Sequence, residues 1–108
     1  YNKDMSRIRI AIPKERTAEF CKRWLIKELS VFGSVLRDDF KPESDVDVLV
    51  TFSPKADWSL FDHVKMQDEL SKVLSRPVHL LTKRSVERSK NWIRKQAILE
   101  NAEVVYAA

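Results

Sequence analysis

The sequence predicts a single domain of the α+β class, because segments of strand and of helical periodicity alternate along 108 residues. Two apolar runs typical of strands, 29–32 and 48–50, flank a polar stretch, and a third such run follows at 78–81. Between 58 and 75 the apolar residues recur instead at helical spacing. A chain of this length has enough residues for one hydrophobic core but not for two.

The first half of the chain predicts one helix and two paired strands. Pro13 suits the first position of a helix, and residues 13–24 would place Phe20 and Trp24 one turn apart on its inner face. The alternating segment 27–32 predicts a half-buried strand, and 45–52 predicts a second one. We expect these two strands to be neighbours in the sheet.

The second half predicts a long packing helix over residues 58–75 that ends before Pro77 and holds its aromatic side chains in the core. A short strand over 78–81 follows. The remaining residues, from Ser85 to about Tyr106, predict a helical region that is interrupted or bent near Asn91.

Functional information is concentrated between the first two strands, and it begins with Gly33, the only glycine of the chain. Glycine tolerates a positive φ and lets the backbone approach a ligand closely. Ser34 could cap a short helix that starts at Val35, and the free amides at such a start attract phosphate. The guanidinium of Arg37 could donate two hydrogen bonds to a phosphate. We therefore expect Gly33, Ser34 and Arg37 to bind a nucleotide.

Two carboxylates follow, Asp45 and Asp47, at a spacing that places them on the same face of a strand. Magnesium is commonly held by one or two carboxylates together with substrate phosphates, so this pair predicts half of a metal site. Each feature alone has a simpler explanation, a plain turn for Gly-Ser and solvated or capping carboxylates for Asp-x-Asp. Their succession favours nucleoside triphosphate and divalent metal chemistry.

The segments 33–37 and 44–50, separated by a polar loop, resemble the minimal nucleotidyltransferases of the DNA polymerase β superfamily. The likeness covers nearly the whole chain from about Ile12 and includes these later segments: 76–82, the closing helix 93–100 and Tyr106. The resemblance implies a mixed β-sheet with helices packed on one side. It also implies that Asp45 and Asp47 are catalytic and hold Mg²⁺ or Mn²⁺, with ATP as the substrate.

The same resemblance implies a biological role. Many members of this family are antitoxins paired with a HEPN-domain ribonuclease toxin, and some transfer AMP from ATP to a tyrosine hydroxyl of that toxin. We therefore expect a HEPN-type toxin and a nucleoside triphosphate as partners.

The sequence departs from the family at its third carboxylate, a position that His79 occupies here. A neutral imidazole is a competent general base near pH 7, but it prefers zinc, copper or nickel to magnesium as a ligand. Two interpretations stay open. His79 is a third catalytic residue, or it only fills the strand face and the protein neutralises its toxin by direct contact.

Composition sets the remaining expectations. The net charge of +4, with 33% charged residues, describes a soluble chain of one domain, residues 1–108, with residues 1–11 as a frayed end. The single Cys21 is typical of a reducing cytoplasm, and no apolar run is long enough to span a membrane. A basic run after His79 could face an anion, although a solvated face is the simpler explanation; it consists of Lys83, Arg84, Arg88, Lys90, Arg94 and Lys95. No DNA-reading motif is present, so direct nucleic-acid binding is not expected, while homo- and hetero-oligomers both stay open.

Overall fold

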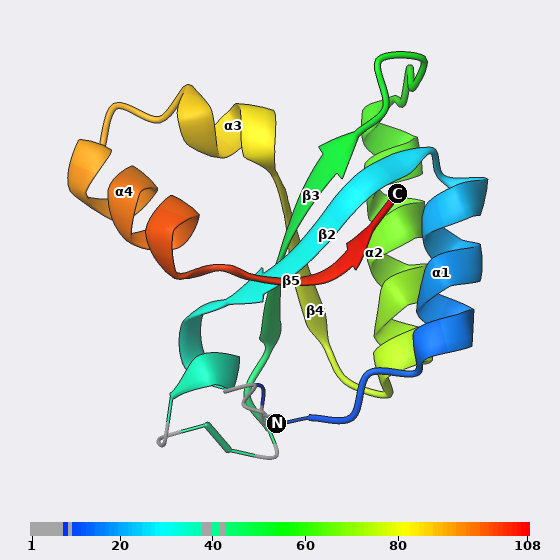
Figure 1. Cartoon of the computed structure of the whole chain (residues 1–108), viewed down its shortest axis with the longest axis horizontal. Helices are drawn as coiled ribbons and strands as arrows, with labels where there is room; N and C mark the ends of the chain where they lie inside the picture. Colours follow the sequence, from blue (N-terminus) through cyan, green and yellow to red (C-terminus); the bar gives the residue numbers. More distant parts are fainter. Residues whose placement is uncertain (1–7, 9, 38–39, 42) are drawn as a thin grey trace.

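The computed structural model describes residues 8, 10–37, 40–41 and 43–108, and it contains a mixed four-stranded sheet in the order β4-β3-β2-β5. Strand β2 (Ile26–Phe32) runs antiparallel to β3 (Val46–Phe52), which confirms the predicted pairing. Strand β4 (Val78–Thr82) runs parallel to β3 at one edge, and β5 (Glu103–Ala107) runs antiparallel to β2 at the other (Figure 1). The predicted frayed end falls mostly on residues outside this description.

Helices α1 (Lys14–Arg23) and α2 (Leu60–Leu74) lie side by side against one face of the sheet (Figure 1). The main core forms there, and it is built around alternate residues of β3 with side chains from both helices: Val46, Val48, Val50, Phe20, Met66 and Leu70. Because strand residues alternate between faces, Asp47 and Leu49 face the other side of the sheet. The strand that carries Asp47, and that Asp45 immediately precedes, is thus anchored by three buried valines.

The opposite face carries a smaller apolar cluster, formed by Phe32, Leu49, Val86 and Ile98. Val86 belongs to α3 (Lys83–Glu87) and Ile98 to α4 (Trp92–Asn101). The α+β class and the mixed sheet are confirmed. The expected packing of helices on one side holds for α1 and α2, while α3 and α4 contribute to this second cluster.

The start of α2 differs from the prediction. A capping box begins the helix, since the Asp62 N–H donates to Ser59 Oγ (3.2 Å) and the Ser59 N–H donates to Asp62 Oδ2 (2.9 Å). The expectation that the aromatic residues of this segment are core is wrong for Phe61, which is 87% exposed. Phe61 lies about 140° around the helix from Met66, outside the buried stripe.

Trp58, just before α2, is half-buried and ties this helix to the end of α1. Its indole N–H donates to the Trp24 carbonyl oxygen (2.8 Å), and the two rings meet edge to face with centroids 5.1 Å apart. The Trp24 indole N–H in turn donates to Glu69 of α2 (3.0 Å). These contacts hold the two helices to each other.

The predicted helical region up to Tyr106 is wrong at its end. Helix α4 ends at Asn101, and residues Glu103–Ala107 form β5, with Leu29 opposite Tyr106 and Val31 opposite Glu103. The β-branched and aromatic residues of this segment suit a strand, and its pairing covers an edge that β2 would otherwise expose. Among the described residues, no helix combines the length and the apolar character that crossing a bilayer requires.

Candidate active site

The turn after β2 brings the backbone at Gly33 against the side chain of Asp47. Gly33 has a φ of +76°, in the left-handed region, and a Cβ placed there would lie 2.4 Å from Asp47 Oδ2. The close approach follows from the sheet register, because Phe32 pairs directly with Asp47. Only glycine satisfies both the backbone conformation and the contact. The predicted flexible residue and the predicted carboxylate therefore share one location.

Ser34 does not have the predicted capping role. Gly33–Leu36 form a short 3₁₀ helix, η1, whose N-cap residue is Phe32, and no side chain caps it. Ser34 lies inside this turn, where its carbonyl oxygen accepts a hydrogen bond from the Arg37 N–H (2.9 Å). The prediction of a helix start capped by Ser34 is wrong, because the turn begins one residue earlier.

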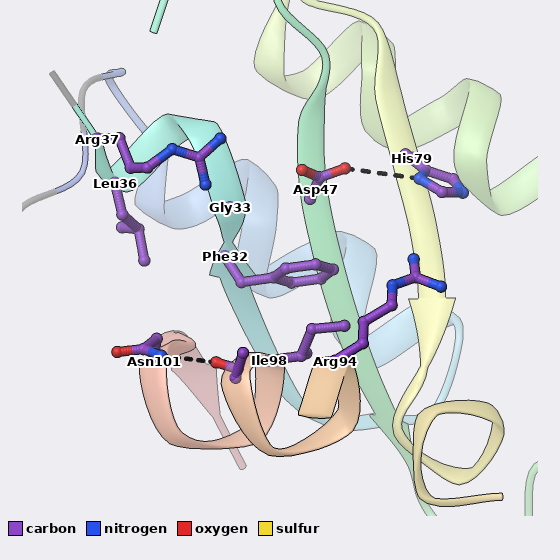
Figure 2. Close-up of a pocket in the computed structure, with 10 residues that line it drawn as sticks. Phe32, Gly33, Leu36, Arg37, Asp47, His79, Arg94, Ile98 and Asn101 are labelled. Carbon is purple, nitrogen blue, oxygen red and sulfur yellow. Dashed lines mark hydrogen bonds and ion pairs between the residues drawn. The ribbon is translucent and has the colours of Figure 1, made fainter. Parts of the chain in front are cut away.

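His79 lies directly beside Asp47 on the neighbouring strand. The parallel register pairs the two residues, so their side chains emerge on the same face, and His79 Nδ1 lies 3.5 Å from Asp47 Oδ1 (Figure 2). The His79 side chain is 53% exposed and that of Asp47 is 28% exposed. Asp47 is therefore contacted on both sides, by His79 at one oxygen and by the Gly33 turn at the other.

The surroundings of Asp47 have opposite effects on the pKa of its carboxyl group. Burial raises the pKa of its carboxyl above the ordinary value, and the charge of Asp45 adds to this rise. The contact with His79 and the charge of Arg37 lower it. Asp45 itself is exposed and immediately precedes β3, and Arg37 is exposed and extended just after η1. The charges of both residues thus act on Asp47.

A cavity of about 470 Å³ opens at this point, within the size range of ordinary ligand sites. Four predicted site residues line it: Gly33, Arg37, Asp47 and His79. Ser34 and Asp45 are not part of this lining. The other lining residues were not in the predicted site: Phe32, Leu36, Arg94, Ala97, Ile98 and Asn101. Four of these come from α4 at helical spacing, a periodicity that the sequence contains but that does not by itself indicate which face meets the cavity.

The family profile described as "Nucleotidyltransferase domain" matches residues 14–105, which is most of the chain. The chain belongs to this nucleotidyltransferase family. It is 35% identical over 88 residues to the protein adenylyltransferase MntA of Thermococcus cleftensis, covering 82% of this chain and 81% of that protein. A candidate protein adenylyltransferase of Methanocaldococcus jannaschii, MJ1215, is 31% identical over 84 residues, covering 78% and 94%.

Another M. jannaschii relative, the candidate protein adenylyltransferase MJ0435, is 41% identical over 61 residues, covering 56% of this chain and 63% of its own length. Solved structures confirm the fold. A candidate minimal nucleotidyltransferase superposes with a TM-score of 0.62 at 29% identity, covering 83% of this chain and 86% of that one. A toxin–antitoxin structure with AMP-PNP superposes with a TM-score of 0.66 at 14% identity, covering 88% and 73%.

The donor set of this nucleotidyltransferase suits a metal that is shared with a substrate. Within the described residues, no three His, Cys, Asp or Glu side chains gather as a protein-only metal cluster. Asp45 and Asp47 supply oxygen ligands of the kind that Mg²⁺ and Mn²⁺ accept, and Mg²⁺ is commonly completed by substrate phosphates and water. The imidazole of His79 is a poorer ligand for Mg²⁺. The residues present thus fit a divalent metal held by two carboxylates and a triphosphate.

Proposed function

We propose that this nucleotidyltransferase is an antitoxin that transfers AMP from ATP to a tyrosine hydroxyl of a partner HEPN ribonuclease toxin. The names of its relatives support adenylyl transfer to a protein. A structural neighbour supports the class of partner. In it, a tri-AMPylated HEPN toxin of Shewanella oneidensis is in complex with an MNT antitoxin, whose fold matches this chain with a TM-score of 0.59 at 14% identity.

The observation that carries the proposal is the contact between the Gly33 turn and Asp47, with His79 on the other side of the carboxylate. A phosphate chain that lies along this turn would meet the Asp47 carboxylate and the charge of Arg37 together. Asp45 and Asp47 would hold Mg²⁺ or Mn²⁺. When bound, the metal would neutralise charge on the phosphates and orient them for displacement.

The reaction exchanges one phosphorus–oxygen bond for another. The tyrosine oxygen forms a bond to the α-phosphorus of ATP, and the bond from that phosphorus to the oxygen bridging to the β-phosphorus breaks. Pyrophosphate leaves with the electron pair of the broken bond. His79 contacts Asp47 through Nδ1, so its Nε2 is the atom that we assign to accept the hydroxyl proton. The products are pyrophosphate and a toxin that carries AMP on a phosphodiester bond.

The test is label transfer from α-³²P-ATP, with Mg²⁺ or Mn²⁺, to the proposed HEPN partner toxin. We expect label on the toxin and none with Asp47→Asn, which keeps the side-chain size but removes the charge. Asp68→Asn is the matched control, because Asp68 is an exposed carboxylate on α2 that pairs with Lys72, one turn away (3.3 Å), and is not part of the cavity lining. Equal transfer by wild type and the Asp47 variant would refute the site.

A second function is favoured by one observation, the histidine at the position of the family's third carboxylate. In this alternative the protein neutralises its toxin by contact alone. His79→Asp separates the two. If only the aspartate variant labels the toxin, while wild type still relieves toxicity, the contact-only function is correct. If wild type labels the toxin and both His79→Asp and His79→Ala lower the rate, the histidine takes part in AMP transfer.

A further inference from the structure

Helix α4 presents a regular stripe to the cavity. The lining residues of this helix follow the spacing i, i+3, i+4 and i+7, which places them on one helix face: Arg94, Ala97, Ile98 and Asn101. Arg94 is the only charged residue of that face. In Figure 2 its side chain extends from α4 toward β4 below His79, while Arg37 reaches in from the opposite side of Asp47. The cavity thus has a guanidinium on each of two walls.

The position of Arg94 is fixed by the first turns of α4. The Arg94 backbone N–H donates to Asn91 Oδ1 (3.1 Å), which caps the helix. One turn later, Ile98 is buried against Phe32 and Leu49 of the sheet. The backbone at Arg94 is therefore held in place, and binding of a ligand would require only a change in the orientation of its long side chain.

Among the described residues, the charge of Arg94 is not paired with a carboxylate. Within the part of the chain that the structure describes, no acidic side chain forms a salt bridge with its guanidinium. The charges that shift the pKa of Asp47 are those of His79, Asp45 and Arg37, so Arg94 is not committed to that carboxylate either. A guanidinium that lines a ligand-sized cavity without a carboxylate partner is well suited to bind phosphate oxygens, because its planar fork matches their geometry.

We propose that Arg94 binds the phosphate chain of the nucleotide from the α4 side, opposite Arg37; this assignment rests on the proposed use of ATP. Arg94 contacts the β- and γ-phosphates, whereas the α-phosphate lies at Asp47. From this assignment we expect the site to bind nucleoside triphosphates more tightly than monophosphates.

Calorimetric titration of the full chain with AMP-PNP and with AMP, both in the presence of Mg²⁺, tests this assignment. We expect Arg94→Ala to weaken AMP-PNP binding about tenfold or more, the size expected for lost hydrogen bonds between charged groups, and to change AMP binding less than about twofold. Arg94→Lys should recover part of the loss. The matched control is Arg88→Ala, since Arg88 is an exposed arginine at the end of α3 and outside the lining of this cavity.

The results that would overturn the assignment differ from those that would overturn the proposed function. Equal AMP-PNP affinity for wild type and Arg94→Ala rejects the role of Arg94 and leaves the use of ATP intact. Equal weakening of AMP-PNP and AMP, with a lower melting temperature, also rejects it, since Arg94 would then only support α4. A wild-type protein that binds neither nucleotide rejects the proposed function and the role of Arg94 together.

Discussion

Replacement of Gly33 by alanine tests the geometry on which the site depends. The added methyl group destabilises the folded protein in two ways. The φ of +76° at this position is in the left-handed region, which disfavours an L-residue by about 1–2 kcal/mol. The new Cβ would also lie 2.4 Å from Asp47 Oδ2, so the carboxylate has to rotate out of its position. Forcing that side chain away from its rotamer adds about 0.5–1.5 kcal/mol.

Together these effects lower the free energy of unfolding of Gly33→Ala by about 1.5–3.5 kcal/mol, which corresponds to a melting temperature lower by roughly 6–28 °C for a domain of this size. The measurement is thermal unfolding followed by circular dichroism, with AMP-PNP titration beside it. We expect nucleotide binding to fall further than stability accounts for, because the displaced Asp47 carboxylate no longer meets the metal and phosphates.

A double-mutant cycle with Asp47→Ala separates the two effects. Once the carboxylate is removed, Gly33→Ala should lower stability only by the backbone contribution of about 1–2 kcal/mol. The same loss in both backgrounds would show that the Gly33 turn and Asp47 do not touch. An unchanged melting temperature for Gly33→Ala alone would refute the left-handed turn as well.

Three further predictions concern the half-buried Asp47 and the buried Cys21 and Thr17. Because the pKa of Asp47 is raised in the folded protein, its ionisation opposes folding: the stability it contributes is full below the ordinary value of 3.8 and lost as pH rises through the folded-state pKa. Asp47→Asn should therefore melt at a higher temperature than wild type at pH 7, and the difference should vanish toward pH 3.8; no difference at pH 7 would contradict the raised pKa. Burial raises the pKa of the Cys21 thiol to about 12, so a thiol reagent at pH 8 should label it only in denaturant, and rapid labelling of the native protein would contradict its burial. The Thr17 hydroxyl is buried and has no hydrogen-bond partner within the described residues, so Thr17→Val should raise the free energy of unfolding by about 1 kcal/mol in urea titrations, and a loss of stability would indicate a partner.

The sequence predicted those parts of the site that depend on local order. Strands β2 and β3 are antiparallel neighbours, so the residue that ends one strand lies near the residue that begins the other, and Gly33 meets Asp47 for that reason. The pairing of His79 with Asp47 has a different origin. The two residues lie on parallel strands separated by α2, and no spacing in the sequence fixes that register. Family resemblance alone placed His79 at the third position.

Neither the part of the cavity that α4 lines nor strand β5 could be predicted, because the apolar residues of these segments show only weak helical or strand periodicity. Ile98 is the only buried residue of α4, so the pattern does not indicate which of its faces meets the protein. The segment Glu103–Ala107 directly follows this helix, and its few β-branched residues become a strand because the edge of β2 is available to pair with. Both outcomes are decided by contacts with distant segments, and Arg94 was therefore visible only as part of a basic run.

The failed prediction for Ser34 follows from the same glycine that lies against Asp47. Gly33 already belongs to the turn, because its left-handed backbone bends the chain at the end of β2, and the N-cap position falls on Phe32. Phe32 has no side-chain oxygen with which to cap the turn, and its ring packs into the cluster around Ile98 instead. For the proposed phosphate binding, the backbone of the turn beside Asp47 is therefore a better candidate than a helix start capped by Ser34. Ser34→Ala should then leave the melting temperature within about 2 °C of wild type, since exposed or partly exposed substitutions away from caps change stability little. A larger fall would restore the capping role.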